Sequence, residues 1–307
     1  MPTVLITGGT GTIGQTLTES LLKRNFEVII LSRSSPKKTN YSGLTYAYWD
    51  PEKMQVDENA ISTADYIIHL AGAGVADIRW SEKRKKEIHD SRVNGGRLLV
   101  HALKNFPNKI KCLVSSSAIG WYGPDPQIPN PDPFKENDNS YPGFLGDTCN
   151  DWEASIKPLE SNLRLVILRI GIVLSNNGGA LAEFKKPLRF RMAAILGRGK
   201  QVVSWIHVDD LVNLFLFAME NSHWKGIYNA VAPAPVSNKQ LTLSLAKATG
   251  GFYIPFNVPA FLLKLIMGEL SIEVLKSATV SSKKIQESGF NFQFPKIDDA
   301  MNDLVRK

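Results

Sequence analysis

Short apolar runs alternate with stretches of helical periodicity over the first half of the chain. The runs are rich in β-branched residues and predict buried strands at 4–6, 27–32, 44–49, 65–72, 111–117 and 163–169. Helical patterns run through Leu17 and Leu21, from Trp80 to about Phe106, and from Asp147 to Leu159. Strands that alternate with helices predict an α/β fold with a Rossmann-type, doubly wound parallel sheet.

The pattern becomes less regular from about residue 175. We expect a basic helix at 180–195, a strand at 202–206, a helix opened by Asp209 and Asp210, a strand at 226–230, a helix capped by Ser237, and helices near 261–267 and 297–305. These elements divide the chain into a Rossmann core at 1–174, with a strand and helix returning at about 202–232, and a small mixed, mainly helical C-terminal lobe on the substrate side at 175–307. The long irregular stretch at 121–146 indicates function or disorder.

Four glycines follow the first strand directly and stand immediately before a helical pattern. Gly9, Gly11 and Gly14 fit the dinucleotide fingerprint, while Gly8, Gly11 and Gly14 fit its tighter variant. Such glycines permit the sharp turn, let backbone amides approach a pyrophosphate, and allow the helix to pack closely on the strand. The helix N-terminus would then hold the anion. A Gly- and Thr-rich turn can imitate this pattern, but its place in the first β-α-β unit favours a bound dinucleotide.

The end of the second strand indicates which dinucleotide is bound. An Asp or Glu at this position would accept hydrogen bonds from the ribose hydroxyls of NAD. This chain instead has Ser32 and Arg33, followed by the basic stretch to Lys38. Ser32 and Arg33 could hold a 2′-phosphate, so NADP is the expected cofactor. The alternative is a basic turn that binds nothing.

Composition narrows the class of protein. The 307 residues carry a formal net charge of +7, and the densest basic cluster, at 83–86, is flanked by Glu82 and Glu87, as on a solvated helix face. We therefore expect neither nucleic acid nor a membrane as a partner. The two cysteines, Cys112 and Cys149, indicate no disulfide framework, and we find no membrane-length apolar run and no room for a leader before the first strand, which favours a cytoplasmic protein.

Few side chains suggest chemistry by position alone. The five histidines (His69, His89, His101, His207 and His223) show no metal-ligand spacing, so no catalytic zinc is expected. His69 lies in an aliphatic strand and is interpreted as a packed core residue. Cys149 has no neighbouring histidine to activate it, and a packed thiol is the better interpretation. Asp209 and Asp210 are interpreted as a helix cap and a connection to the C-terminal lobe.

Several motifs together resemble the extended branch of the short-chain dehydrogenase/reductase superfamily. They are the turn 7–14, His69-Leu70-Ala71, Ser115–Ser117 leading to Tyr122-Gly123, Leu168-Arg169, and Trp205 to Asp210. Further motifs resemble an atypical, epimerase-like subgroup of NADP-dependent oxidoreductases and nucleoside-diphosphate-sugar epimerases over the whole chain: Arg79-Trp80, Ser91-Arg92, Asp151-Trp152-Glu153, Gly178-Gly179 and Gly289-Phe290.

This resemblance implies a set of cofactor-lining residues and also shows a departure. Together with the glycine turn, the implied cofactor-binding residues are Gly8, Gly11, Thr12, Ile13, Gly14, Ser32, Arg33, Leu70, Ala71, Gly72, Glu87, Arg92 and Val173. In the wider family a Tyr-x-x-x-Lys pair performs the acid/base step. Leu145 and Cys149 occupy those positions here, and neither side chain can take over the role. Arg92 stands where the larger family usually has Asn.

Ser117 and Tyr122 are the remaining catalytic candidates. Ser117 ends the fifth strand, where the family places a carbonyl-polarising hydroxyl, with Ser115 and Ser116 as alternatives. Tyr122 could donate a proton if a cation such as Arg92 lay nearby. The expected protein is an NADP(H)-dependent oxidoreductase or epimerase-like enzyme, monomer or homodimer, acting on an unknown small carbonyl or sugar-nucleotide substrate. The alternative is a non-catalytic NADP-binding sensor or interaction module.

Overall fold

The computed structural model describes residues 1–34 and 41–306. The strands of its central sheet are β1 (Thr3–Thr7), β2 (Glu27–Ser32), β3 (Leu44–Asp50), β4 (Gln55–Val56), β5 (Tyr66–His69), β6 (Cys112–Ala118), β7 (Arg164–Ile170) and β12 (Gly226–Ala230). The helices beside it are α1 (Thr12–Lys23), α2 (Glu58–Thr63), α3 (Glu82–Asn105), η1 (Ile119–Trp121), α4 (Phe144–Ile156), η2 (Lys157–Leu159) and α6 (Val208–Glu220). Each strand expected in the first half of the chain is present.

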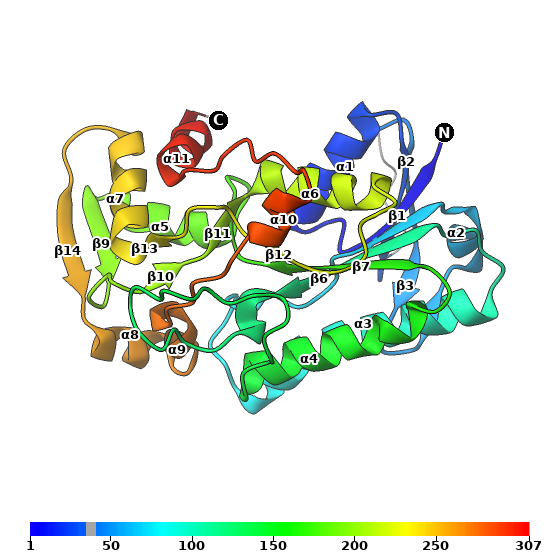
Figure 1. Cartoon of the computed structure of the whole chain (residues 1–307), viewed down its shortest axis with the longest axis horizontal. Coiled ribbons are helices and arrows are strands. Elements are labelled where there is room, and N and C mark those ends of the chain that lie inside the picture. The colour runs from blue at the N-terminus through cyan, green and yellow to red at the C-terminus, as the bar shows by residue number, and fades with distance from the viewer. Residues whose placement is uncertain (35–40, 307) are drawn as a thin grey trace.

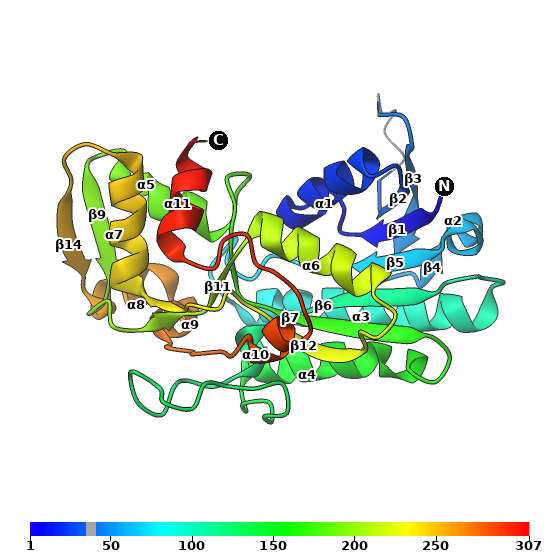
Figure 2. The same cartoon turned by 45° about the horizontal axis from the view of Figure 1, so that its top comes forward.

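The central sheet has the order β12-β7-β6-β5-β1-β2-β3-β4 and is parallel except for the β3–β4 pair. Helices α1 and α6 cover one face, while α2, α3 and α4 lie on the other (Figures 1 and 2). Each face carries its own apolar core: Leu17 and Phe215 belong to the first, and Leu98 and Ile156 to the second. The predicted Rossmann-type, doubly wound fold is confirmed.

Most of the remaining elements form a smaller lobe beside the sheet (Figure 1). They are β8 (Ile172–Leu174), α5 (Ala180–Leu188), β9 (Met192–Leu196), β10 (Val202–Val203), β11 (Trp205–His207), β13 (Val236–Ser237), α7 (Asn238–Thr249), β14 (Ile254–Val258), α8 (Ala260–Met267), α9 (Leu270–Leu275) and α11 (Ile297–Arg306). Helix α10 (Lys283–Glu287) instead packs on β12 of the central sheet, and its Ile285 belongs to the core there. Ser237 caps α7 as expected, because its side chain accepts a hydrogen bond from the Gln240 amide. The division near residue 174 stays a prediction.

The helix expected over 180–195 was wrong in its second half. Pro187 lies inside α5, and Arg191 has a left-handed φ of 59°, so the helix ends at Leu188. The chain then continues as β9, which pairs in parallel with β14. Ala193 and Ile195 are buried at alternate positions, which is the period of a strand. The helix therefore ends before the left-handed residue Arg191, although the helical pattern of the sequence predicted that it would continue to residue 195.

The C-terminal segment returns to the core through a buried carboxylate. Asp210, on the first turn of α6, is fully buried and accepts hydrogen bonds from the amides of Gln293 (2.7 Å) and Phe294 (2.9 Å). The cap of α6 is His207, whose ring accepts a hydrogen bond from the Asp209 amide. The expectation that the aspartates themselves cap this helix was therefore wrong, although Asp210 does connect the core to the lobe.

The irregular stretch at 121–146 is fastened to the lobe by a second carboxylate. Asp125 accepts hydrogen bonds from the hydroxyls of Ser277 and Thr279 and from the Thr279 amide. The Phe134 amide also donates to the Thr279 carbonyl.

Within residues 1–34 and 41–306, no helix is both long enough and apolar enough to cross a membrane.

Replacing Asp210 with Ala is expected to lower the free energy of unfolding by about 2 kcal/mol, because two buried amides lose their acceptor. Urea unfolding of the full chain measures this change. Glu220→Ala is the matched control, because Glu220 is an exposed carboxylate at the other end of the same helix. Equal midpoints for the two variants would contradict the role given to Asp210.

Candidate functional site

The glycine turn has no room for side chains at two positions. A Cβ on Gly14 would lie 2.6 Å from the Gly9 Cα and closer still to the Gly8 carbonyl oxygen. A Cβ on Gly8 would lie 2.9 Å from the Ala71 amide nitrogen, and the φ of Gly8 is +72°. These contacts bring the start of α1 against the exits of β1 and β5, as dinucleotide-binding turns require.

The first turn of α1 leaves its backbone donors available to a ligand. Gly11 is the N-cap and offers no side chain, and the first turn contains no acidic residue. Thr12 and Ile13 follow, so their amides and the positive end of the helix dipole face outward from the turn. Gly178 lies beside Thr12, because a Cβ on Gly178 would come within 3.3 Å of the Thr12 hydroxyl. The arrangement fits a pyrophosphate group.

A hollow of about 700 Å³ opens next to this turn, between α1 and the outer strands. Its walls come from the glycine turn, one side of α1, and β2 and β3; the residues are Gly9, Thr10, Gln15, Thr18, Glu19, Leu22, Lys23, Ile30, Tyr41, Leu44 and Tyr46. None of the residues predicted to bind the cofactor lines this hollow. Sequence reasoning missed this hollow, because it depends on how far α1 stands from the sheet.

The predicted 2′-phosphate residues stand at the end of β2. Ser32 is half-buried, and its hydroxyl contacts the Ser34 hydroxyl at 3.1 Å. Arg33 is exposed, and no carboxylate in residues 1–34 or 41–306 lies within ion-pair distance of it. Lys37 and Lys38, which complete the predicted basic stretch, fall outside the described residues. Arg33 is therefore a cation whose charge no described acidic residue neutralises.

The Thr7 side chain holds the residues that follow the carboxyl end of β5. Leu70, Ala71 and Gly72 lie there and were expected to line the cofactor. The Thr7 hydroxyl oxygen accepts hydrogen bonds from the amides of Leu70 and Ala71, both at 3.1 Å. Its own proton must then point to Nδ1 of His69, 2.7 Å away. This assignment places the ring proton of His69 on Nε2. His69 is fully buried, as its interpretation as a packed core residue predicted. Its bond to Thr7 also helps to hold the carboxyl end of β5.

Arg92 is brought to the same strand exit. Its guanidinium donates to the carbonyl oxygens of Ala73 (3.0 Å) and Ile88 (2.8 Å), and a Cβ on Gly72 would lie 3.1 Å from its Cζ. It also stacks over the Trp152 ring at 5.1 Å. Glu87, one turn earlier on α3, is exposed and pairs with Arg84.

Val173 lies on β8 and pairs with Ile206 of β11. β8 begins two residues after the carboxyl end of β7. Val173 therefore lies on a short strand that follows the carboxyl end of β7. In parallel sheets, ligands bind at the carboxyl ends of the strands.

Ser117 and Tyr122 are joined by a buried network centred on Arg169. The Ser117 hydroxyl donates to Glu153 at 2.6 Å, and Arg169 donates to both Glu153 carboxylate oxygens at 2.8 and 2.9 Å. Arg169 also donates to the Tyr122 hydroxyl at 3.0 Å, which in turn donates to Asn229 at 2.7 Å. The cation beside Tyr122 is therefore Arg169, and the expectation that Arg92 would supply it was wrong.

Burial governs the acidity of this network. It raises the pKa of Tyr122 to about 12, although Arg169 acts in the opposite direction. Each hydroxyl already has a protein acceptor, so both groups are held in place rather than turned toward solvent. Sequence reasoning named Glu153 and Arg169 only as parts of motifs. The available signal was the position of Arg169 inside an apolar strand, whereas Glu153 lies on a helix that also carries Asp147 and Asp151.

Leu145 and Cys149 lie together on α4, beside the end of β6. A Cβ on Gly120 would lie 3.2 Å from the Leu145 Cβ and 3.6 Å from the Cys149 sulfur. Burial raises the pKa of Cys149 to about 11, and its thiol points to the Ala118 carbonyl oxygen. Leu145 has no proton to exchange, and Cys149 stays a buried, protonated thiol at neutral pH.

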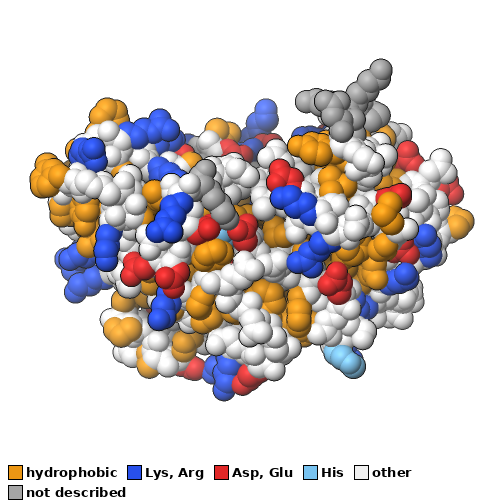
Figure 3. All heavy atoms as spheres, turned by 90° about the horizontal axis from the view of Figure 1, so that it is seen from above, with side chains coloured by type: hydrophobic (Ala, Val, Ile, Leu, Met, Phe, Trp, Pro, Cys, Tyr) orange, Lys and Arg blue, Asp and Glu red, His pale blue; other side chains and the backbone are white. Residues whose placement is uncertain are grey.

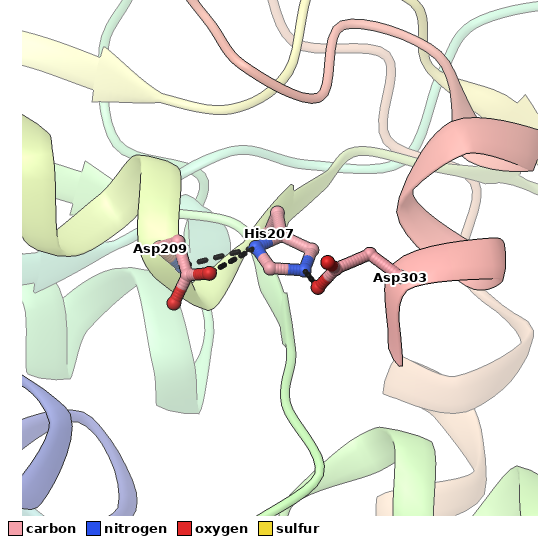
Figure 4. A group of neighbouring side chains, drawn as sticks. All are labelled: His207, Asp209 and Asp303. Atoms are coloured by element: carbon pink, nitrogen blue, oxygen red, sulfur yellow. Dashed lines mark hydrogen bonds and ion pairs between the residues drawn. The ribbon is translucent and has the colours of Figure 1, made fainter. Parts of the chain in front are cut away.

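His207, Asp209 and Asp303 form the one His- and carboxylate-containing cluster with metal-site spacing in the described part of the chain. Figure 4 shows the two carboxylates on opposite sides of the imidazole ring. Asp209 lies 3.9 Å from Nδ1, and Asp303 lies 3.3 Å from Nε2. Nδ1 also accepts the Asp209 amide hydrogen bond. Because the two carboxylates lie against different ring nitrogens, the imidazole links the start of α6 to α11.

The fold and the glycine turn together define a dinucleotide-binding protein of the Rossmann type. Residues 4–230 match the NAD dependent epimerase/dehydratase family, and the chain belongs to that family. Residues 258–304 match a domain of unknown function, DUF1731. The resemblance seen in the sequence is thereby confirmed.

Relatives extend this similarity over the whole chain. The chain is 33% identical to the chloroplastic homologue of the epimerase family protein SDR39U1 from Arabidopsis thaliana, covering 99% of this chain and 87% of that protein. It is also 33% identical to an epimerase family protein of Staphylococcus saprophyticus, with 98% of each chain covered. A crystal structure of human SDR39U1 with NADPH matches with a TM-score of 0.87 and 27% identity, covering 99% of both chains.

The buried His69 predicts a pH dependence of stability. Burial, assisted by Arg92, lowers its pKa from 6.5 to about 4, so the folded protein keeps this ring neutral while the unfolded chain takes up a proton. The free energy of unfolding should fall as the pH drops from 6.5 towards 4, by about 3 kcal/mol from this group. Urea unfolding across this pH range measures the change. The free energy of unfolding of His69→Asn should depend less steeply on pH than that of the parent protein. Parallel curves for the two proteins would rule out His69 as the source.

Proposed function

We propose that this protein binds NADP(H) and uses it in an oxidoreductase or epimerase-like reaction on a small carbonyl or sugar-nucleotide substrate. The observation that carries the proposal is the pairing of a glycine cradle at the start of α1 with Arg33 at the end of β2. The cradle fits a pyrophosphate, and an arginine in place of an acidic residue fits a 2′-phosphate. The NADPH in the structure of the human relative supports the same choice of cofactor.

The cofactor site proposed for this chain combines three parts. Gly8, Gly11, Thr12, Ile13 and Gly14 form the cradle; Ser32 and Arg33 hold the phosphorylated ribose; Leu70, Ala71, Gly72, Glu87, Arg92 and Val173 form the part nearer the nicotinamide. When bound, the nicotinamide supplies or accepts the hydride. The protein contributes position, because Thr7 and His69 fix the strand exit and Arg92 braces the loop behind it.

Ser117 and Tyr122 remain the proposed catalytic residues. Their action requires Tyr122 to exchange its Asn229 partner for a substrate oxygen, with Arg169 retained as the neighbouring cation. Arg169 stabilises the phenolate form and thereby opposes the effect of burial. Ser117 would orient the same oxygen after releasing Glu153.

A second candidate function is an NADP-responsive sensor or interaction module. Two observations favour it: both candidate hydroxyls are already hydrogen-bonded within the protein, and Leu145 and Cys149 supply no acid/base pair. In this case the cofactor would bind without turnover.

Turnover separates the two functions. The full-length protein with NADPH is expected to consume the cofactor when given a panel of carbonyl compounds, including nucleotide sugars and quinones, followed by nicotinamide absorbance. Tyr122→Phe should then lower turnover by about 100-fold, whereas Tyr141→Phe, a change to an exposed tyrosine, should not. Tight NADPH binding without consumption would favour the sensor. Unchanged turnover in Tyr122→Phe would remove that residue from the chemistry.

Cofactor choice is tested at Arg33. Arg33→Ala should weaken NADP binding by about tenfold or more through loss of a charge-assisted contact, while NAD binding should change little. Calorimetric titration of both cofactors gives the ratio, with Arg97→Ala as a control at another exposed arginine. Equal affinity of the parent protein for NADP and NAD would defeat the 2′-phosphate assignment.

Cytoplasmic localisation and a monomeric or homodimeric state remain predictions. Both cysteines are free and buried, which suits a reducing compartment. One of the relatives is a chloroplast protein, so the compartment of this chain needs fractionation to establish.

A further inference from the structure

The end of the smaller lobe concentrates the positive charge of the molecule. Two segments, 180–201 and 238–268, supply α5, β9, α7, β14 and α8. They contain nine lysines and arginines with Glu183 as their one acidic residue, a formal charge of +8. Since the whole chain carries +7, the remainder is close to neutral. Figures 1 and 2 show β9 and β14 at the end of the molecule farthest from β3 and α2.

Most of these cations have no acidic partner. Glu183 pairs with Lys186. Among the residues that the structure describes, no carboxylate lies within ion-pair distance of Arg189, Arg191, Arg198, Lys200, Lys239, Lys247 or Lys264. On α11, Asp298 shares a hollow with Lys239 and Lys247, and this marks the border of the basic region. The charge is therefore available to an external anionic surface.

The same end exposes large apolar side chains. Met192 and Ile254 begin the strands β9 and β14, and Phe190 and Phe252 lie two residues before them; on α8 the exposed residues are Phe261, Leu262, Leu265 and Ile266. Phe261 is 73% exposed and Leu265 is 70% exposed, whereas Leu263 alone on this helix is buried. Side chains so exposed would cost free energy in water unless a partner covers them. We call these eight residues, with the seven cations above, the distal face.

Strand register explains why the sheet points these side chains outward. Met192 pairs with Ile254, and Ala194 pairs with Phe256, on one side of the ribbon. The alternate residues Ala193 and Ile195 are buried, with Ala193 in the core that contains Leu241 and Leu245 of α7. The apolar residues on the other side therefore face away from the body of the lobe. Figure 3 shows lysine, arginine and hydrophobic side chains at this end, with acidic side chains beside them.

We propose that the distal face docks on the surface of an anionic lipid bilayer. Phosphate headgroups would satisfy the cations, and the acyl boundary would receive the exposed Phe, Leu and Ile side chains. A second copy of the chain fits less well, because an isologous contact would place +8 against +8. Nucleic acid would satisfy the charges but offers no apolar layer for aliphatic side chains.

This proposal changes the expectation of no membrane partner. That expectation rested on the cluster at 83–86, interpreted as a solvated helix face, and on the lack of a membrane-length apolar run. The folded chain instead brings charge from two separate segments together with exposed apolar residues. The contact is peripheral, on one face, and it is independent of the proposed reaction.

Co-sedimentation of the full-length protein with vesicles tests the proposal. Binding is expected to vesicles of phosphatidylcholine and phosphatidylglycerol in equal parts, with little binding to phosphatidylcholine alone and release at high salt. Replacing Phe261, Leu265 and Ile266 together with Ser should lower the partition coefficient by about tenfold or more. Replacing Arg198 and Lys200 with Glu should also weaken binding. Met54→Asn and Lys104→Glu, which change an exposed apolar residue and an exposed cation away from the distal face, should bind like the parent.

Three results would overturn the proposal. The first is no preference for anionic vesicles. The second is a dimer, measured by light scattering, that dissociates in the triple Ser variant, because the occupant is then a second copy. The third is binding of duplex DNA that the Ser substitutions leave unchanged and that displaces the protein from vesicles. NADPH titration of each variant confirms that its core is folded, or, where the parent binds no cofactor, urea unfolding does so.

Discussion

The fold depends on a steric constraint at the first turn of the chain. Gly14 lies so close to Gly8 and Gly9 that any side chain would collide with backbone, which cannot move aside. Gly8 in turn lies against Ala71, so one close contact sets the separations of α1, β1 and β5. The free amides of α1 point where they do because these three elements meet without intervening side chains. The anion-binding geometry is therefore a result of packing, before any ligand is present.

The rest of the candidate site builds outward from this contact in two different ways. On one side, Thr7 and His69 hold the carboxyl end of β5 through hydrogen bonds, and the buried His69 ring stays neutral. On the other, Glu153 and Arg169 form a buried ion pair that also holds Ser117 and Tyr122. A buried pair of this kind costs desolvation, and full hydrogen bonding offsets much of that cost. Both sets of hydrogen bonds hold side chains at the carboxyl ends of β5, β6 and β7.

Sequence reasoning found the parts of the fold that depend on local pattern. The strands of the sheet and the glycine turn are encoded in consecutive residues, so β-branched runs and glycine spacing were sufficient. The boundary of α5 was not found, because a left-handed residue at Arg191 ended the helix inside an amphipathic pattern. The cap of α6 was assigned to acidic residues although His207 performs it. The partners of Arg169 come from α4, from the start of the irregular stretch and, through Tyr122, from β12, and such long-range pairings have no local signature.

The hydrogen bonds of Asp210 have a consequence for biosynthesis. The carboxylate lies on α6, which covers the central sheet, while its donors come from residues 293 and 294, which follow it by 83 and 84 positions. A ribosome extends the chain from the N-terminus, so α6 is made long before the amides that satisfy its buried charge. Until those residues leave the exit tunnel, the nascent sheet carries an incompletely covered helix. The packing of α6 onto the sheet therefore stays incomplete until residues 293 and 294 have been made.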